Sequence, residues 1–278
     1  MSNDHTDPKD WSDWETYRDR VVHPAATIKS ADLHRALENI QRCDWAKQYA
    51  ESLVKSGEDI AQQISADYLA HMIETTTPGC VGPCPACRAK GLPWHPNGQW
   101  AWSPTEPDNL QCSVCHTVFP HIEFPEDIAI TSTWGQKQTF TFVGGKPFKC
   151  FGYPHARPSL SGIIRVRKVQ HVTGQLQTLA AAHAVSQNAR YARAAKQVLL
   201  RFAEVFPNYL VRAGYGYGEY AGMDPKIAAQ HILNLPEDEL VYPPNSPDRQ
   251  IFAGYWAASR IGTSGMDGGW VVRVADAY

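Results

Sequence analysis

Two Cys-x-x-Cys pairs constrain this chain more than any other feature. Cys84 and Cys87 form the first pair, Cys112 and Cys115 form the second, and 24 residues separate the two pairs. Each pair makes a tight knuckle that points two thiolates at one place, and two knuckles offer four sulfurs at about 2.3 Å from a tetrahedral Zn²⁺ ion. Four protein ligands leave no open position for water, so we predict a structural and not a catalytic zinc ion.

The segment around these cysteines is rich in proline and glycine, and no helix of useful length fits it. Structural zinc contributes on the order of 10–16 kcal/mol in isolated peptides, enough to fold a segment that has no core of its own. The alternatives are two disulfides or four free thiols. Cys80 is a possible substitute ligand, whereas His116 and His121 are nearby but not required. We expect Cys43 and Cys150 to be buried as small hydrophobes.

Double Cys-x-x-Cys ribbons often bind nucleic acid, so the charge of the ribbon matters. Its basic residues are Arg88 and Lys90 only, and the whole chain has a net charge of −2. A phosphate-tracking surface needs more cations, so we predict no nucleic-acid partner and keep a nucleic-acid-binding ribbon as a minor alternative. No apolar run reaches the roughly 18 residues of a membrane helix, and we predict no membrane partner. The polar N-terminus lacks the apolar core of a signal peptide, so we expect either a cytoplasmic protein, for the sequence as it stands, or a sequence that lacks its true start.

Apolar residues recur at helical spacing over much of the remaining chain, and the predicted fold is mainly α. Ser30 is a plausible cap for a first helix, and a second helix is expected from about Trp45 to Tyr68. Two further helices at about 165–185 and 188–206 are joined by a short break and should form an antiparallel hairpin. A last helix is expected to begin near Trp270. The expected core stripes of the hairpin are Leu176, Leu179, Ala180 and His183 on one helix, and Tyr191, Ala195, Val198, Leu199 and Phe202 on the other.

Two segments interrupt this helical pattern. Residues 76–125 are predicted to form the zinc ribbon, and residues 131–153 a short β-hairpin. The hairpin is predicted from the alternation around Phe140 and Phe142 and from a turn at Gly144-Gly145. Residues 1–22 look like an exposed lead-in.

Three segments occur in a characteristic order: HPAATIKSADLHRALENIQRCDWAKQYAESL, then CPAC…CSVC followed by FP, then HVTGQLQTLAAAHAVSQNARYARAAKQVLLRFAEVFPNY. This order resembles the N-terminal part of the heparinase II/III-like polysaccharide lyases, particularly bacterial members with a cysteine ribbon before the toroid. The resemblance covers most of residues 21–278. Of the three segments, only the cysteine ribbon is a specific motif by itself. The rest of the support for this resemblance comes from the order of the segments.

The resemblance implies an (α/α) toroid of stacked helical hairpins around a groove. For this chain it implies an incomplete toroid over 23–278, interrupted by the ribbon and the hairpin. The implied reaction is β-elimination on a uronic-acid polysaccharide, in which one group neutralises the C5 carboxylate, a Tyr or His removes the C5 proton, and a Tyr protonates the leaving oxygen. Those groups lie in later toroid helices of the family, so the catalytic residues here are unknown and we expect the active site to be incomplete. Family members are often periplasmic or secreted. The oligomeric state is not indicated.

Aromatic and basic residues near the C-terminal end are the candidate sugar contacts. Tyr217 and Tyr220 lie in a Gly-Tyr loop, where their rings could stack on sugar faces, and Trp256 and Arg260 are one helical turn apart. Trp270 follows two glycines. The alternatives are a packed loop, core tryptophans and an arginine in a surface ion pair. A non-catalytic carbohydrate-binding or structural protein on the same helical scaffold would share these residues, and it remains the alternative function.

Overall fold

The computed structural model describes residues 20, 27–79, 82–95, 98–132, 137–150, 153–210, 259–261 and 264–278. The predicted lead-in over 1–22 lies almost wholly outside these residues, as do Tyr217, Tyr220 and Trp256. Within them the chain is mainly helical with a few short antiparallel strands, as the sequence predicts. None of the described helices has the length and apolar character that would let it cross a membrane.

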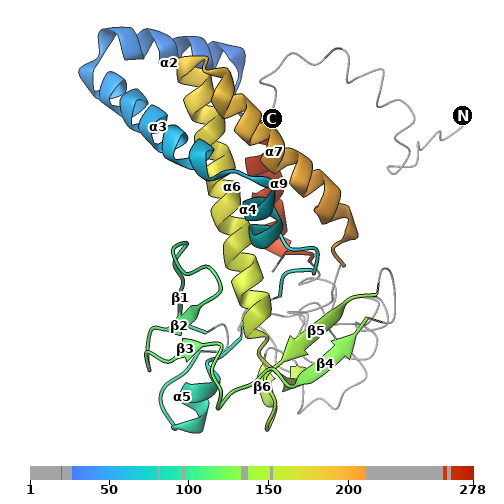
Figure 1. The fold of residues 1–278 in the computed structure, drawn as a ribbon. Coiled ribbons are helices and arrows are strands. Elements are labelled where there is room, and N and C mark those ends of the chain that lie inside the picture. Colours follow the sequence, from blue (N-terminus) through green and yellow to red (C-terminus); the bar gives the residue numbers. More distant parts are fainter. Residues whose placement is uncertain are drawn as a thin grey trace, which may run out of the picture.

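One long helix, α6 (Leu160–Ser186), runs through the molecule (Figure 1). Other helices pack along it, and the ribbon and the short strands surround its N-terminal end (Figure 1). Because α6 has neighbours on several sides, its buried residues lie all around the helix and include the polar Arg165 and Lys168. The helices that contact α6 are α3 (Asp44–Gln63), α4 (Ala66–Met72), α7 (Ala189–Val205) and α9 (Ser264–Ala277), whereas α2 (Ser30–Arg42) packs on α3.

Helices α6 and α7 form the predicted antiparallel hairpin (Figure 1). Gln187 ends α6 in the left-handed region at φ 56°, and the Asn188 side chain then caps α7 by accepting the N–H of Arg190 at 3.0 Å. A one-turn 3-10 helix, η1 (Phe206–Asn208), follows α7 at the predicted proline stop. The central residues of both predicted stripes lie in the core, with Leu176, Leu179 and Val198 fully buried. The described helices do not by themselves trace a toroid, which stays a prediction.

The N-terminal helices differ from the prediction at their ends. Ser30 is the first residue of α2 and not its cap, because Lys29 takes that position and its N–H donates to the Asp32 carboxylate at 3.0 Å. The predicted helix reaching Tyr68 is wrong at its C-terminal end. Its first part, α3, stops at Gln63, and the Ser65 hydroxyl then accepts the N–H of Tyr68 at 3.1 Å. A serine that caps a new helix competes with continuation of the old one, so α4 begins separately.

The strands within the described residues form three small antiparallel sheets. The ribbon sheet has the order β1 (Trp100–Ala101), β2 (Leu110–Cys112), β3 (Val118–Phe119). Next come the pair β4 (Ile128–Thr131) and β5 (Thr139–Phe142) and the pair β6 (Phe148–Cys150) and β7 (Tyr153–Ala156).

The predicted turn at Gly144-Gly145 is therefore wrong, since these glycines connect two hairpins. Phe140 pairs with Ile130, and Phe142 pairs with Ile128. The two isoleucines precede the segment that the alternation suggested, and they pack with both phenylalanines and Leu210 in one apolar cluster.

Several contacts attach the non-helical part to the start of α6, and two of them involve the backbone of its first turn. The N–H of Gly79 donates to the carbonyl of Gly162 at 2.9 Å, and a Cβ on Gly79 would lie 2.4 Å from the Gly162 Cα. The two backbones can cross this closely only because both residues are glycines. The Glu126 carboxylate accepts the N–H groups of Leu160 and Ser161 and so caps α6 from a distant segment.

Candidate metal centre

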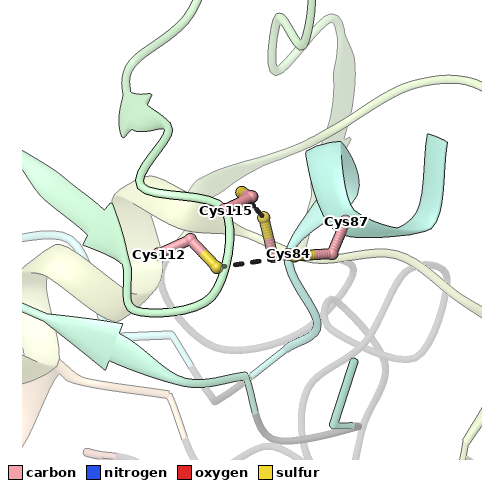
Figure 2. Close-up of side chains that lie close together, drawn as sticks. All are labelled: Cys84, Cys87, Cys112 and Cys115. Carbon is pink, nitrogen blue, oxygen red and sulfur yellow. Dashed lines mark hydrogen bonds between the residues drawn. The ribbon is translucent and has the colours of Figure 1, made fainter. Parts of the chain in front are cut away.

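The two Cys-x-x-Cys pairs lie on two tight turns that face each other. Cys84 is the N-cap of the short helix α5 (Pro85–Ala89), and Cys87 lies within that helix. Cys112 ends β2, and Cys115 lies in the turn toward β3, where His116 has a left-handed φ of 57°. Figure 2 shows the four sulfurs converging from these two turns.

The four sulfurs have the spacing of a tetrahedral metal site. Sγ of Cys84 lies 3.6 Å from Sγ of Cys115, and Sγ of Cys87 lies 3.6 Å from Sγ of Cys112. All four sulfurs lie within 4.8 Å of one another. A tetrahedron with metal–sulfur bonds of about 2.3 Å has sulfur–sulfur edges of ~3.8 Å. The donor set therefore fits a four-coordinate ion, and the cysteines are free thiols without a disulfide.

The cluster is shielded from water by the protein. Cys84, Cys87 and Cys112 are at most 3 % exposed, and Cys115 is half-buried. The cysteines belong to one apolar cluster in which the ribbon packs against the first turns of α6. Its other buried members are Ala86, Leu110, Phe119, Val143, Leu160, Ile163 and Ile164. The centre thus lies within the ribbon and shares an apolar cluster with the start of the long helix.

The thiols differ in acidity. Burial raises the pKa of Cys84 well above its usual value, and burial raises the pKa of Cys87 to about 11. Burial opposes ionisation of Cys115 as well, but hydrogen bonds with Thr117 and with the neighbouring thiols lower the pKa of Cys115 to about 6. Because zinc binds thiolates, metal binding would release the protons that these thiols hold.

The other candidate ligands lie outside this group. Among the described residues, the four cysteines form the one cluster of His, Cys, Asp or Glu side chains with metal-binding geometry. His121 packs its ring against Phe119 and Phe124 at centroid distances of 6.3 and 5.7 Å. Cys80 and the side chain of Cys150 lie outside the described part of the chain, and Cys43 is only half-buried.

Arg260 is one of two predicted sugar contacts that the structure describes. Its Nη1 donates to the carbonyl oxygens of Pro207 at 3.1 Å and Tyr209 at 2.7 Å, and its guanidinium lies 5.5 Å from the Phe206 ring centroid. These contacts bind the segment after α7. The predicted pairing with Trp256 lies outside the described residues, so substrate binding by Arg260 stays a prediction.

Trp270 is the other described sugar candidate, and it lies on α9. Its ring stacks on Phe206 at 4.2 Å and meets Phe202 edge-on at 5.2 Å. Within the described residues its buried indole Nε1 has no hydrogen-bond partner. The contacts of Trp270 hold α9 to α7, and a role in sugar binding stays a prediction.

The sequence prediction missed a charged cluster between the ribbon and the helices. Lys168 is buried on α6 and contacts Glu74 and Asp108, and His71 contacts the same Asp108. A lysine on the apolar face of the predicted α6 was a possible indication, because a buried ammonium needs a partner. Nothing in the sequence identified the carboxylates.

Comparison of the chain with protein-family models, with curated proteins and with solved structures finds no match.

Proposed function

We propose that Cys84, Cys87, Cys112 and Cys115 bind one structural Zn²⁺ ion. The observation that carries this proposal is the convergence of four sulfurs within 4.8 Å of one another. A tetrahedral set of four sulfurs suits zinc or an iron–sulfur cluster. Two Cys-x-x-Cys knuckles on tight turns are typical of a single zinc ion. Four protein ligands would close its coordination shell, so the ion would stabilise the ribbon and would not activate water.

The position of the centre explains what such an ion would stabilise. The ribbon packs on Leu160, Ile163 and Ile164 at the start of α6, and the ribbon strands contain only two or three residues each. Such short strands bury little apolar surface without help. Zinc in this position would hold the ribbon together and, through it, support the first turns of the long helix.

We further propose that the chain is the N-terminal portion of a polysaccharide lyase that acts by β-elimination on a uronic-acid polysaccharide. The order of the three segments that resemble the heparinase II/III-like family supports it. The antiparallel hairpin of α6 and α7 is the kind of unit from which an (α/α) toroid is built. In such a reaction the C5–H bond and the C4–O bond break, a C4=C5 double bond forms, and the leaving oxygen gains a proton.

A cleft beside the ribbon offers cations that suit an acidic polymer. It has a volume of about 540 Å³ and is lined by Arg88, Lys146 and Arg157 together with Glu123 and Asp127. Arginine forks match carboxylate geometry, and the lining has a surplus of one positive charge. This cleft supports an acidic substrate as a proposal, whereas the catalytic base and acid remain unassigned.

The zinc proposal is tested by metal analysis of the purified protein. We expect one zinc per chain in the wild type and none in Cys84→Ser. The matched control is Cys43→Ser, because Cys43 is a free cysteine outside the cluster and should leave the zinc content unchanged. A folded, metal-free wild-type protein with an ordered ribbon would contradict the proposal.

The lyase proposal is tested by the absorbance of the unsaturated product. Alginate, heparan and related uronate polymers are offered to this chain and to a version extended downstream. We expect turnover by the extended version and little or none by the 278-residue chain, since the family's catalytic groups lie in later helices. Turnover by neither would favour a non-catalytic carbohydrate-binding or structural protein. Equal turnover by both would place the catalytic residues within this chain.

A further inference from the structure

A second open pocket lies away from the cysteines and from the cationic cleft. It is formed by the C-terminal end of α3, the middle of α6 and the loop between β1 and β2. Its volume of about 670 Å³ falls within the roughly 300–1,000 Å³ that small-molecule sites occupy. Its lining is Ile60, Gln63, Pro104, Thr105, Gln170, His171, Gly174, Gln175 and Thr178.

The lining carries no permanent charge. It contains three amides, two hydroxyls and one imidazole, and burial lowers the pKa of His171, so that ring is neutral at neutral pH. Arg167 and Lys168 precede this part of α6 and are not among the lining residues, and Lys168 is already paired with Glu74 and Asp108. An anion in this pocket would give up part of its hydration without a cation in the lining to replace it. A neutral ligand with many hydroxyl groups meets donors and acceptors on several sides.

Some of the polar groups are held in place by other side chains. The Tyr68 hydroxyl donates to Oε1 of Gln175 at 2.8 Å, and Nε2 of Gln175 donates to Oε1 of Gln63 at 3.3 Å. This chain of hydrogen bonds leaves the Nε2 group of Gln63 as a donor for a ligand. The amides of Gln63 and Gln175 are thus oriented before any ligand arrives, which reduces the entropic cost of binding.

An aromatic side chain supports the imidazole at the pocket. The Trp102 ring lies 5.6 Å from the His171 ring, and its Nε1 donates to the Pro107 carbonyl at 2.9 Å, which fixes the indole. This contact restrains the His171 ring. A neutral imidazole offers one donor and one acceptor.

One lining residue of the pocket, Gly174, has no side chain, so only its backbone faces the pocket. A Cβ on Gly174 would meet no heavy atom within 4 Å, so packing does not require glycine at this position on α6. A larger side chain there would project into the pocket. We propose that this pocket binds an uncharged sugar unit of a saccharide, with the amides of Gln63, Gln170 and Gln175, the Thr hydroxyls and His171 contacting its hydroxyl groups. This goes beyond the proposed lyase function and does not depend on it.

The test is a binding titration followed by NMR on the 278-residue protein. The neutral probes are trimers of glucose, mannose and N-acetylglucosamine, and the anionic probes are trimers of guluronate and glucuronate. We expect at least one neutral probe to bind in the millimolar range or tighter and to shift the amide signals of Gln170, His171 and Gly174. The anionic probes should bind at least ten-fold more weakly at this pocket.

Two variants locate the binding. Gly174→Leu fills the pocket without removing a polar group, and we expect at least a ten-fold loss of affinity. Gln170→Ala keeps the helix and removes one amide, and we expect a loss of three-fold or more. The matched control is Gln62→Ala, whose side chain bonds Glu58 outside the pocket and which should bind as wild type does.

Three outcomes would overturn the proposal: no binding by any neutral probe, stronger binding of the uronate trimers at this pocket, or unchanged affinity in Gly174→Leu and Gln170→Ala. Lyase activity does not enter the readout, so failure here and failure of the proposed reaction are separate results.

Discussion

The ammonium nitrogen of Lys168 lies 2.7 Å from Oδ1 of Asp108, although the two residues belong to different parts of the fold. Lys168 is on α6, and Asp108 is in the loop between β1 and β2 of the ribbon. The same ammonium lies 2.9 Å from Glu74 and donates to the His71 carbonyl at 3.3 Å. Lys168 is only 2 % exposed, so its charge depends on these partners. The cluster therefore couples the ribbon to the helices.

Removing the carboxylates that pair with Lys168 should reveal how much this cluster contributes to the free energy of unfolding. Asp108 is 64 % exposed, so Asp108→Asn or Glu74→Gln alone should cost about 1 kcal/mol or less. The double variant leaves a buried ammonium without a carboxylate partner, and it should cost about 3–5 kcal/mol. Urea unfolding of the single and double variants measures the non-additivity. The control is Glu204→Gln, which removes a surface pair with Arg201 and should change the free energy of unfolding by less than about 0.5 kcal/mol. Additive costs in the double variant would show that the ammonium finds other partners.

The stability contributed by Asp108 should depend on pH. The hydrogen bond from Lys168 lowers the pKa of Asp108 below its usual 3.8; burial opposes this shift and the hydrogen bond with His71 adds to it. A carboxyl with a lowered folded-state pKa contributes stability above its unfolded pKa, and this contribution disappears as pH falls through the folded value. The difference in unfolding free energy between wild type and Asp108→Asn should therefore shrink from about pH 5 toward about pH 3. Urea unfolding at each pH measures it. A difference that is constant over this range would contradict the ion pair.

Chelation of the metal should destabilise one region more than the rest. We expect a strong zinc chelator to lower the melting temperature and to increase hydrogen exchange of backbone amides over residues 84–119 and in the first turns of α6. The C-terminal half of α6 packs against α7 through Leu176, Leu179 and Val198, so its amides should remain protected. Mass-resolved hydrogen exchange with and without chelator makes the comparison. Uniform loss of protection over the whole chain would show that the ribbon is not a separate cooperative unit.

The sequence predicted the elements that depend on local pattern or spacing. The α6–α7 hairpin follows from helical periodicity, and the cysteine cluster follows from the two Cys-x-x-Cys spacings, because both patterns act over a few residues. The break at Ser65 was missed because a serine suits a helix interior poorly but does not forbid it. The sequence prediction paired β5 with the strand that follows Gly144-Gly145. In the structure β5 pairs instead with β4, through Ile128 and Ile130, which precede it in the sequence.

Long-range contacts could not be predicted in this way. The carboxylate of Glu126 caps α6 from 34 residues away in sequence, and Lys168 meets Asp108 only after the ribbon folds back. The pocket between α3 and α6 needs three segments at once. Such contacts depend on how elements pack, and a single sequence does not specify that packing by any local pattern.

Two glycines on the same helix should respond to alanine in opposite directions. Gly162 faces Gly79, and an added Cβ would lie 2.6 Å from the Gly79 Cα and 2.8 Å from the Ser159 hydroxyl. A Cβ added to Gly174 would instead meet no heavy atom within 4 Å. Both substitutions gain helix propensity of roughly 0.5–1 kcal/mol. For Gly174→Ala that gain should appear as added stability. For Gly162→Ala the backbones must separate, which costs about 1–3 kcal/mol and more than cancels the gain.

Chemical denaturation of the wild type and the two variants under identical metal loading measures both effects. Gly162→Ala should also increase hydrogen exchange of the backbone amides in the ribbon. If Gly162→Ala were as stable as Gly174→Ala, the crossing of Gly79 over the start of α6 would not be as close as described.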